Sequence, residues 1–271
     1  AYLHSATMVK AGVYLFGRLF PALHGVAWWA PVLIVFGAVT MLLGAYLALR
    51  SSELKKIFAY TTVSQLGLLT CMYGLGGYEH HGESNLIWPV MQIMNHALYK
   101  APLFIIAGAI THATGKKLLG DVKGLWRSHR VLALIGILAA YGLAGGPLTL
   151  SFTAKEAFLY QIYHAAEQEP RIWVIGVMAV LTAGLNVAIF WRILTTFIAR
   201  PEGELHGEHE HEGGFWGATI WWPAALLVAL QFVGGVGTSF FGGVIQPIET
   251  HLGYWAHLGK GSVWSAISHP G

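Results

Sequence analysis

Long apolar stretches alternate with short polar ones along most of the chain. A helix needs about 20 mostly apolar residues to cross the hydrocarbon core of a bilayer. Gly, Ala, Ser and Thr are scattered among the large apolar residues, which suits helices that pack against one another in lipid. The pattern therefore predicts an all-α polytopic membrane fold. We expect about seven transmembrane segments, at Tyr2–Phe20, Ala30–Arg50, Ile57–Gly77, Trp88–Ala113, Arg130–Ala165, Ile172–Ala199 and Gly217–Phe241.

The fifth stretch is too long for one simple span, and a Gly-Gly-Pro run at 145–147 interrupts it. Proline disrupts a helix, and Thr149 or Ser151 can cap a new one. We predict a discontinuous helix with halves at Arg130–Ala144 and Phe152–Ala165. Broken backbone at membrane depth must be buried in protein or line a wet cavity, and in transporters it lies at ion sites. A helix hairpin or a proline-kinked span without a function is the alternative.

Composition excludes several classes of protein. Charged residues are 11% and hydrophobic residues 55% of the 271 residues, whereas soluble domains have about 25% charged residues. A dispersed net charge of +3 gives no reason to expect a nucleic-acid partner. The single cysteine, Cys71, excludes an intrachain disulfide and a cysteine-based metal site. The chain has no Gly-rich nucleotide loop and no redox ligand set, so we expect no cofactor.

The stretch 204–212 alternates Glu and His and resembles a metal-binding tract. Its i, i+2 spacing does not define a tetrahedral site, and it lies in a Gly-rich connecting segment. We therefore predict a solvated charged loop there, and no metal site.

Lys and Arg are unequally divided between the loops on the two sides of the membrane. The loops at 50–56, 114–130 and 200–216 carry nine of them, against three on the other side. Since cytoplasmic loops are enriched in Lys and Arg, we predict that the loops at 50–56 and 114–130 are cytoplasmic. The apolar pattern is already present at Ala1 without a charged leader, so we expect the chain to be a fragment cut in or beside a membrane segment.

Three lysines, Lys10, Lys100 and Lys155, lie well inside predicted spans. A charged lysine at the centre of a span costs about 2.5–3.5 kcal/mol on insertion scales, so such residues are functional candidates by default. Lys10 shares its span with His4, which is equally compatible with a hydrogen-bonded packing residue and with a proton relay. Arg192 is close to a predicted cytoplasmic end and can extend its head group to the interface.

The fourth span carries Gln92, His96 and Lys100 at i, i+4 and i+8, which places them on one face of a helix. Pro102 follows and leaves the carbonyl of Leu98 without its helical partner. Because His titrates near neutrality, an adjacent His and Lys can pass a proton between them. A polar seam that only holds helices together is the alternative.

Lys155 and Glu156 directly follow the predicted break. Glu156 is the only carboxylate of the 13 that we place within the membrane, and it can pair with a basic group on another helix. A cation near a helix start is electrostatically unfavourable, which suits a lysine that must gain and lose a proton.

Four stretches in order resemble signatures of the antiporter-like membrane subunits of Mrp-type cation/proton antiporters and respiratory complex I. They are residues 2–15 (YLHSATMVKAGVYL), 55–67 (KKIFAYTTVSQLG), 95–101 (NHALYKA) and 151–156 (SFTAKE). The resemblance extends to about residue 245. Lys10 and the Lys100-Ala101-Pro102 junction favour the large, A-type subunit of the Mrp antiporters.

This resemblance implies two inverted five-helix repeats, each with a broken helix, and a buried chain of Lys, His and Glu that carries protons. Lys100 would be the central relay lysine and His96 its bridging partner. Lys155 would be the broken-helix lysine on the exit side, and Lys10 and His4 would connect to the preceding repeat. We expect residues 1–245 to hold the second repeat with one helix on either side, without the first repeat, and 246–271 to be an extramembrane tail or the start of a further region.

The implied function is that of a proton-translocating subunit in a multisubunit antiporter of the cell membrane. It would exchange Na+ or another monovalent cation for H+, together with other membrane subunits, and would be a secondary transporter and not an enzyme. A proton-pumping subunit of complex I or a related hydrogenase is the first alternative. A scaffold with a degenerate relay is the second, and the retention of His96, Lys100, Lys155 and Glu156 argues against it.

Overall fold

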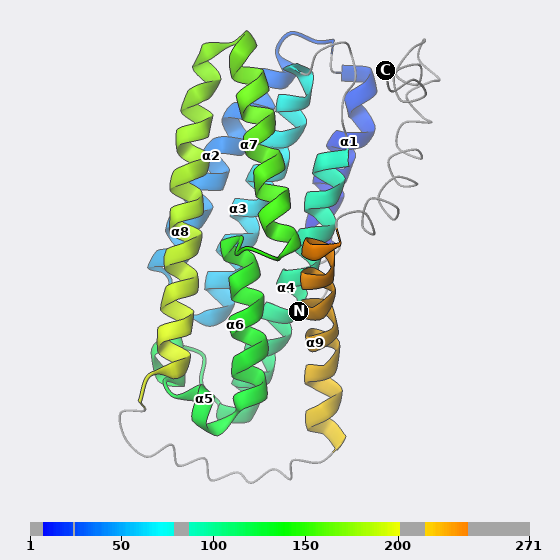
Figure 1. Ribbon diagram of the computed structural model, residues 1–271. Coiled ribbons are helices and arrows are strands. Elements are labelled where there is room, and N and C mark those ends of the chain that lie inside the picture. The colour runs from blue at the N-terminus through cyan, green and yellow to red at the C-terminus, as the bar shows by residue number, and fades with distance from the viewer. Residues whose placement is uncertain (1–7, 24, 79–86, 201–214, 238–271) are drawn as a thin grey trace.

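The computed structural model describes residues 8–23, 25–78, 87–200 and 215–237. These residues form a bundle of long helices without a β-strand (Figure 1). The long helices are α1 (Ala11–Leu23), α2 (Trp29–Arg50), α3 (Leu54–Leu75), α4 (Ile87–Thr114), α6 (Arg130–Ala144), α7 (Leu150–Gln168), α8 (Trp173–Ile198) and α9 (Phe215–Val236). The short ones are η2 (Met8–Lys10), η3 (Gly76–Tyr78), η5 (Leu119–Val122), α5 (Leu125–Ser128) and η6 (Pro170–Ile172).

The helices confirm the predicted all-α polytopic membrane fold and most of the predicted spans to within a few residues. In the described part, Trp29–Arg50, Trp88–His112 and Pro170–Ile198 are long and apolar enough to cross a membrane on their own. The remaining long helices are shorter or carry more polar residues. The first predicted span is described only from Met8 onward.

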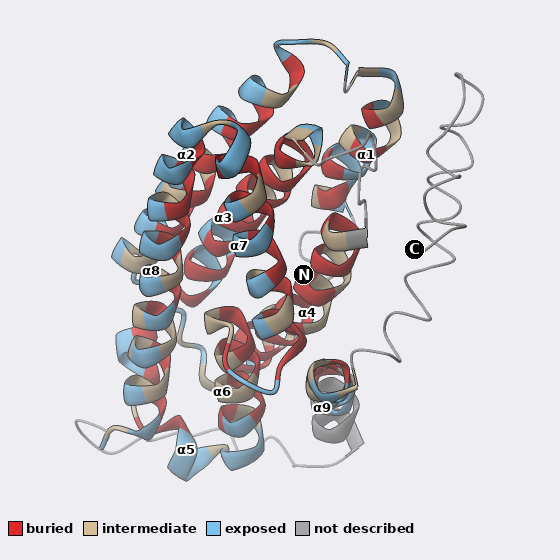
Figure 2. Cartoon of the chain, turned by 45° about the horizontal axis from the view of Figure 1, so that its top comes forward, coloured by how far each residue is buried: buried red, intermediate tan, exposed pale blue. Residues whose placement is uncertain are grey.

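Small residues allow α2 and α3 to pack very closely. A Cβ atom on Gly67 would lie 2.4 Å from the backbone nitrogen of Met41, and one on Gly44 would lie 2.5 Å from that of Ser64. Helices in lipid associate through close backbone packing of this kind, because the hydrophobic effect does not drive them together there. Buried residues line the inner faces of the bundle, and the outer faces of α2 and α8 are exposed and mainly apolar (Figure 2).

The helix is interrupted between α6 and α7, as predicted, and α6 has the predicted bounds. Gly145 follows α6 with a φ of 80°, a conformation in which glycine has no steric penalty. The N–H of Gly146 donates to the carbonyl of Tyr141 at 3.1 Å and closes the helix end. Helix α9 covers the break so closely that a Cβ on Gly235 would lie 2.3 Å from the carbonyl oxygen of Leu148.

One detail of the predicted break is wrong. Thr149 occupies the N-cap position of α7, but its side chain makes no capping hydrogen bond. Its hydroxyl donates back to the carbonyl of Gly146 at 2.6 Å, and the Ser151 hydroxyl donates to Asn95 on α4. Both hydroxyls bond across the break or to another helix, because the tightly covered turn brings those acceptors within reach.

The basic connecting segments lie together at one end of the bundle. The N–H of Leu54 donates to the carbonyl of Lys117 at 3.2 Å, and the N–H of Leu119 donates to that of Ser52 at 2.8 Å. At the same end the guanidinium of Arg192 donates to the carbonyls of Leu49 and Ser51, at the C-terminus of α2. The grouping of these segments on one side agrees with the sequence analysis, and their cytoplasmic orientation stays a prediction.

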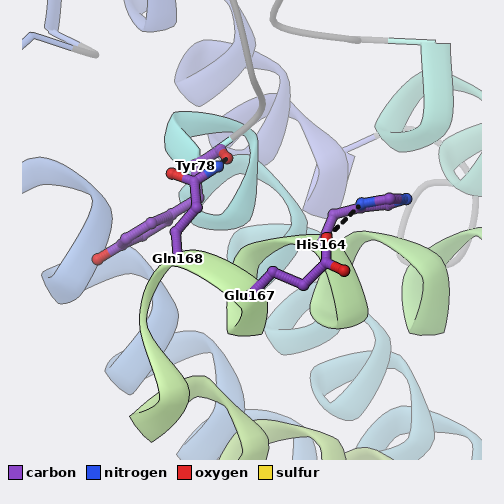
Figure 3. A network of polar contacts seen from close by, with 4 residues as sticks. All are labelled: Tyr78, His164, Glu167 and Gln168. Carbon is purple, nitrogen blue, oxygen red and sulfur yellow. Dashed lines mark hydrogen bonds and ion pairs between the residues drawn. The ribbon is translucent and has the colours of Figure 1, made fainter.

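At the opposite end, the last turn of α7 is joined to the end of α3 (Figure 3). The side chain of Gln168 donates to the carbonyl of Tyr78 in η3. His164 Nδ1 lies 3.1 Å from a carboxylate oxygen of Glu167, one turn away on the same helix. The Gln168–Tyr78 hydrogen bond joins the end of the second half-helix to the rest of the bundle, and the His164–Glu167 pair lies within α7.

Candidate functional site

The three polar residues of α4 that the sequence placed on one helix face are all buried, and the face turns toward α3. Lys100 is fully buried, and its ammonium donates to the carbonyl of Phe58 at 2.9 Å and to the hydroxyl of Thr61. Two turns away, the amide of Gln92 donates to the amide oxygen of Gln65 at 2.7 Å. The predicted polar column is therefore paired with polar groups of α3 at both of its ends.

His96 lies between these two contacts and is also fully buried. Both of its ring nitrogens lack a hydrogen-bond partner among the described residues. Its ring packs edge-on against Tyr99, with the centroids 5.5 Å apart. Buried polar atoms in native proteins are nearly always hydrogen-bonded to protein or water. Two ring nitrogens without a protein partner in a polar column therefore indicate a place for bridging water.

Lys10 joins the same column from another helix. It is 5% exposed, lies at the end of η2, and donates from its ammonium to the carbonyl of Ile93 on α4 at 3.1 Å. Ile93 precedes His96 by less than one helical turn, so the cation reaches α4 close to the imidazole. His4 lies outside the described residues.

Lys155 lies apart from this column, at the break. Its ammonium donates to the last carbonyls of α6, those of Leu143 at 3.0 Å and Ala144 at 2.6 Å. These carbonyls have no partner within α6, and they form the negative end of its dipole. The sequence indicates the positive start of α7 near Lys155 and does not show which helix end lies opposite it. The structure adds the opposite field of α6, which the same ammonium contacts directly.

A cavity of about 100 Å³ adjoins Lys155 between α2, α3, α7 and α8. Its lining includes Thr182 and Asn186 of α8 together with apolar residues such as Met41 and Phe158. Asn186 is buried, and neither polar atom of its amide has a partner in the described part of the chain. Most of the lining is apolar, and its polar groups are the Lys155 ammonium, the Thr182 hydroxyl and the Asn186 amide, which are the groups that could bind water there.

Glu156 does not join the buried groups. Its side chain is exposed on the outer face of α7, and it forms no ion pair or hydrogen bond with the described residues. The expectation that it pairs with a basic group on another helix therefore finds no partner in the described part of the chain. Its place on the proton path stays a prediction.

Sequence reasoning missed a chain of uncharged polar side chains that crosses the bundle. Gln231 on α9 donates to Ser151 at 3.0 Å, and Ser151 donates to Asn95 at 2.7 Å. Asn95 donates to Gln92 at 3.0 Å, and Gln92 donates to Gln65. All five are at most 1% exposed. Gln92 and Ser151 were among the residues singled out from the sequence, and the signal for the other three was the presence of amides inside apolar spans.

This amide chain connects the two lysine sites. Asn95 is next to His96 in α4, and Ser151 is one turn before Lys155 in α7. The contact between Asn95 and Ser151 is thus a direct bridge between the helix that carries Lys100 and the half-helix that carries Lys155. Within the described residues, no group of three or more His, Cys, Asp or Glu side chains is placed to hold a metal ion, and the His-rich stretch 204–212 lies outside them.

An all-α bundle of apolar helices with lysines buried inside it defines a polytopic membrane protein that holds ionisable groups within the bilayer. The chain belongs to the NADH:quinone oxidoreductase/Mrp antiporter transmembrane family, whose model matches residues 1–183. This membership confirms the resemblance on which the sequence analysis relied.

Two curated relatives are antiporter subunits. The chain is 35% identical over 237 residues to a probable K(+)/H(+) antiporter A/B-type subunit of Rhizobium meliloti, covering 87% of this chain and 23% of that protein. It is 36% identical over 220 residues to the A-type subunit of the Na(+)/H(+) antiporter of Alkalihalophilus pseudofirmus, covering 77% of this chain and 27% of that one. The chain therefore spans about a quarter of the length of these relatives.

Solved structures of two kinds share the fold. A chain of the Mrp complex from Dietzia sp. matches with a TM-score of 0.74 and 30% identity, over 97% of this chain and 27% of that chain. A chain of respiratory complex I from Thermus thermophilus matches with a TM-score of 0.70 and 23% identity, over 93% of this chain and 50% of that chain. The second match concerns the fold alone.

Proposed function

We propose that this chain is part of a proton-translocating membrane subunit of a multisubunit antiporter that exchanges Na+ or another monovalent cation for H+. The observation that carries the proposal is the full burial of Lys100 beside His96 inside a membrane helix. A lysine in that position is costly, and its partners are a backbone carbonyl and a hydroxyl instead of a carboxylate. An ammonium that has no carboxylate partner among the described residues can give up its proton without breaking an ion pair there.

In the proposed path, Lys10 and His4 supply protons from the side of the preceding repeat, and His96 and Lys100 pass them along α4. Lys155 is the exit lysine at the break, with the cavity beside Asn186 as a place for water. Glu156 contributes from the outer face of α7. Residues 1–245 act as one antiporter-like transmembrane unit, with 246–271 outside it, in the plasma membrane and in contact with other membrane subunits. We propose a secondary transporter and expect it to need no cofactor.

The test is Lys100→Ala in the whole complex, assayed as cation-driven proton movement in inverted membrane vesicles. We expect loss of antiport at a normal level of assembled protein, because the variant also removes the cost of burying a cation, which offsets part of the cost of the cavity that the shorter side chain leaves. Lys56→Ala is the matched control, since Lys56 lies in an exposed position and its ion-pair partner in the described part of the chain is Glu53. Near-normal antiport by the Lys100→Ala complex would refute the relay.

The same vesicles distinguish the alternatives. An antiporter responds to an added Na+ or K+ gradient without any respiratory substrate, whereas a complex I or hydrogenase subunit moves protons only when its electron donor is supplied. A scaffold subunit gives the same transport with or without Lys100.

A further inference from the structure

The outer surface of α7 differs from the other outer surfaces of the bundle. Helices α2 and α8 present mainly apolar side chains there, such as Phe36 at 69% and Val180 at 62% exposure. The described long helices carry two carboxylates, and both are on α7. Glu167 is in the last turn, where it contacts His164, but Glu156 is two turns from the break and has no partner among the described residues.

The exposed residues of α7 form a single stripe. Phe152, Glu156, Leu159, Tyr160 and Tyr163 are all exposed and follow the i, i+4, i+7, i+8, i+11 spacing of one helix face. We call them the α7 face. In Figure 1, α7 lies at the front of the bundle, and Figure 2 shows exposed positions along it. The stripe has the width and spacing with which one helix packs against another.

Lipid does not suit this face. A carboxylate turned toward hydrocarbon is unfavourable, and natural membrane proteins turn such groups toward protein or water, usually with an opposite charge as partner. Tyrosines, moreover, are enriched in protein interfaces. Tyr160 and Tyr163 lie beside Glu156 on the same face, and Tyr160 packs against His164 with the ring centroids 4.2 Å apart.

We propose that the α7 face docks a transmembrane helix of another subunit, and that this helix carries a Lys or Arg side chain that pairs with Glu156. Charge complementarity gives the chemistry of the occupant, because a carboxylate at membrane depth that does not face water is usually paired with a cation. The inference rests on the proposed multisubunit assembly and not on the proton relay. Its test therefore measures assembly, so that a failed relay and a failed interface are distinguishable.

The first experiment places a photo-crosslinking amino acid at Tyr160 in the purified whole complex, with Phe36 on α2 as the control position. We expect Tyr160 to crosslink to a membrane segment of another subunit that contains Lys or Arg, and Phe36 to give lipid adducts. Lipid adducts alone at Tyr160, a crosslink within this chain, or a crosslinked segment without a cation would each overturn the proposal.

The second experiment reverses the charge. Glu156→Lys should lower the amount of partner subunit that copurifies about tenfold, whereas Glu167→Lys should leave it unchanged. Replacing the cation of the crosslinked segment with Glu in the Glu156→Lys background should restore copurification. Unchanged copurification in Glu156→Lys, or no recovery in the double variant, would refute the ion pair. Recovery in the double variant also distinguishes a lost interface from a misfolded subunit, because a charge change on the partner cannot refold this one.

Discussion

At the scale of single residues, Lys155 is subject to two opposing fields. It lies near the positive start of α7, and its ammonium contacts the negative end of α6 through the carbonyls of Leu143 and Ala144. Two of its three N–H donors are occupied, which leaves one for a proton acceptor. The residue is thus held at the point where the two half-helices meet, beside a cavity that reaches α8.

We predict that Lys155→Arg is as damaging to antiport as Lys155→Ala. Arginine can donate to the same two carbonyls, so the contact with α6 survives, but a guanidinium stays protonated in proteins and cannot release its proton. A loss of about a hundredfold is typical when a proton-transfer group is removed. Antiport in vesicles is measured across a range of pH, with Lys117→Arg in the exposed loop as the control. A wild-type profile for Lys155→Arg would mean that the residue acts only as a fixed charge.

Thr61 offers a second test at this scale. Its hydroxyl donates to the carbonyls of Ile57 and Phe58, so its oxygen is free to accept from Lys100. Thr61→Val keeps the shape and removes this acceptor, and we expect slower antiport at a normal level of protein. Thr61→Ser should retain most of the rate. Equal rates in all three proteins would show that the hydroxyl has no part in the function of Lys100.

At the scale of elements, the sequence predicts well what depends on local chemistry. The bounds of α6 agree residue for residue, because Gly145 at positive φ and the proline that follows end the helix by steric rules alone. The column on α4 follows from helical spacing. The hydrogen-bond partners of the lysines were not predictable from the sequence. They are backbone carbonyls, those of Phe58, Ile93 and Leu143, and every residue has one, so tertiary packing decides which carbonyl each lysine reaches.

The sequence did not show on which face of α7 Glu156 lies, for a similar reason. Apolar and small residues occur all round α7, so its sequence does not say which side is inward. The amide chain was hidden because each of its members looks like an ordinary polar residue in a long span. Only the packing of four helices brings Gln65, Asn95 and Gln231 into one hydrogen-bonded line.

Ser151 is the member of that chain whose removal should matter most. Ser151→Ala leaves the oxygen of Asn95 and the amide of Gln231 buried without this partner, at a cost of about 1–3 kcal/mol. We expect a lower melting temperature of the detergent-solubilised complex and reduced antiport. Ser128→Ala, in a connecting segment with a weak 3.4 Å hydrogen bond, is the control and should change neither.

The cover of α9 over the break gives a sharper structural test. Gly235→Ala would place a methyl group 2.3 Å from the carbonyl oxygen of Leu148, so α9 would have to move away from the break. Gly184→Ala on α8 adds the same methyl group with no atom within 4 Å. We expect Gly235→Ala to lower the thermal stability of the complex and Gly184→Ala to leave it unchanged or raise it slightly. Equal stabilities would mean that α9 does not pack on the break.

At the scale of the whole molecule, charge and architecture divide the bundle into two ends. One end gathers the basic connecting segments, which are hydrogen-bonded to one another through Leu54, Lys117 and Leu119. The break lies between the two ends, between the stacked halves α6 and α7, with α9 across it (Figure 1). This arrangement places Lys155, the exit lysine of the proposed path, at the junction of the two half-helices.

The orientation of the two ends is a prediction that a single pair of cysteines can test. Cys71, the one cysteine of the 271 residues, is fully buried, so it contributes little background to labelling of this chain. Lys117 lies in the basic end and Arg171 in the opposite end, where its side chain is 94% exposed. Because Lys and Arg are retained in cytoplasmic loops, a membrane-impermeant maleimide should modify Lys117→Cys in inverted vesicles and Arg171→Cys in intact cells. The reverse pattern would place the basic loops outside, and the proposed entry and exit sides of the path through Lys100 and Lys155 would then be exchanged.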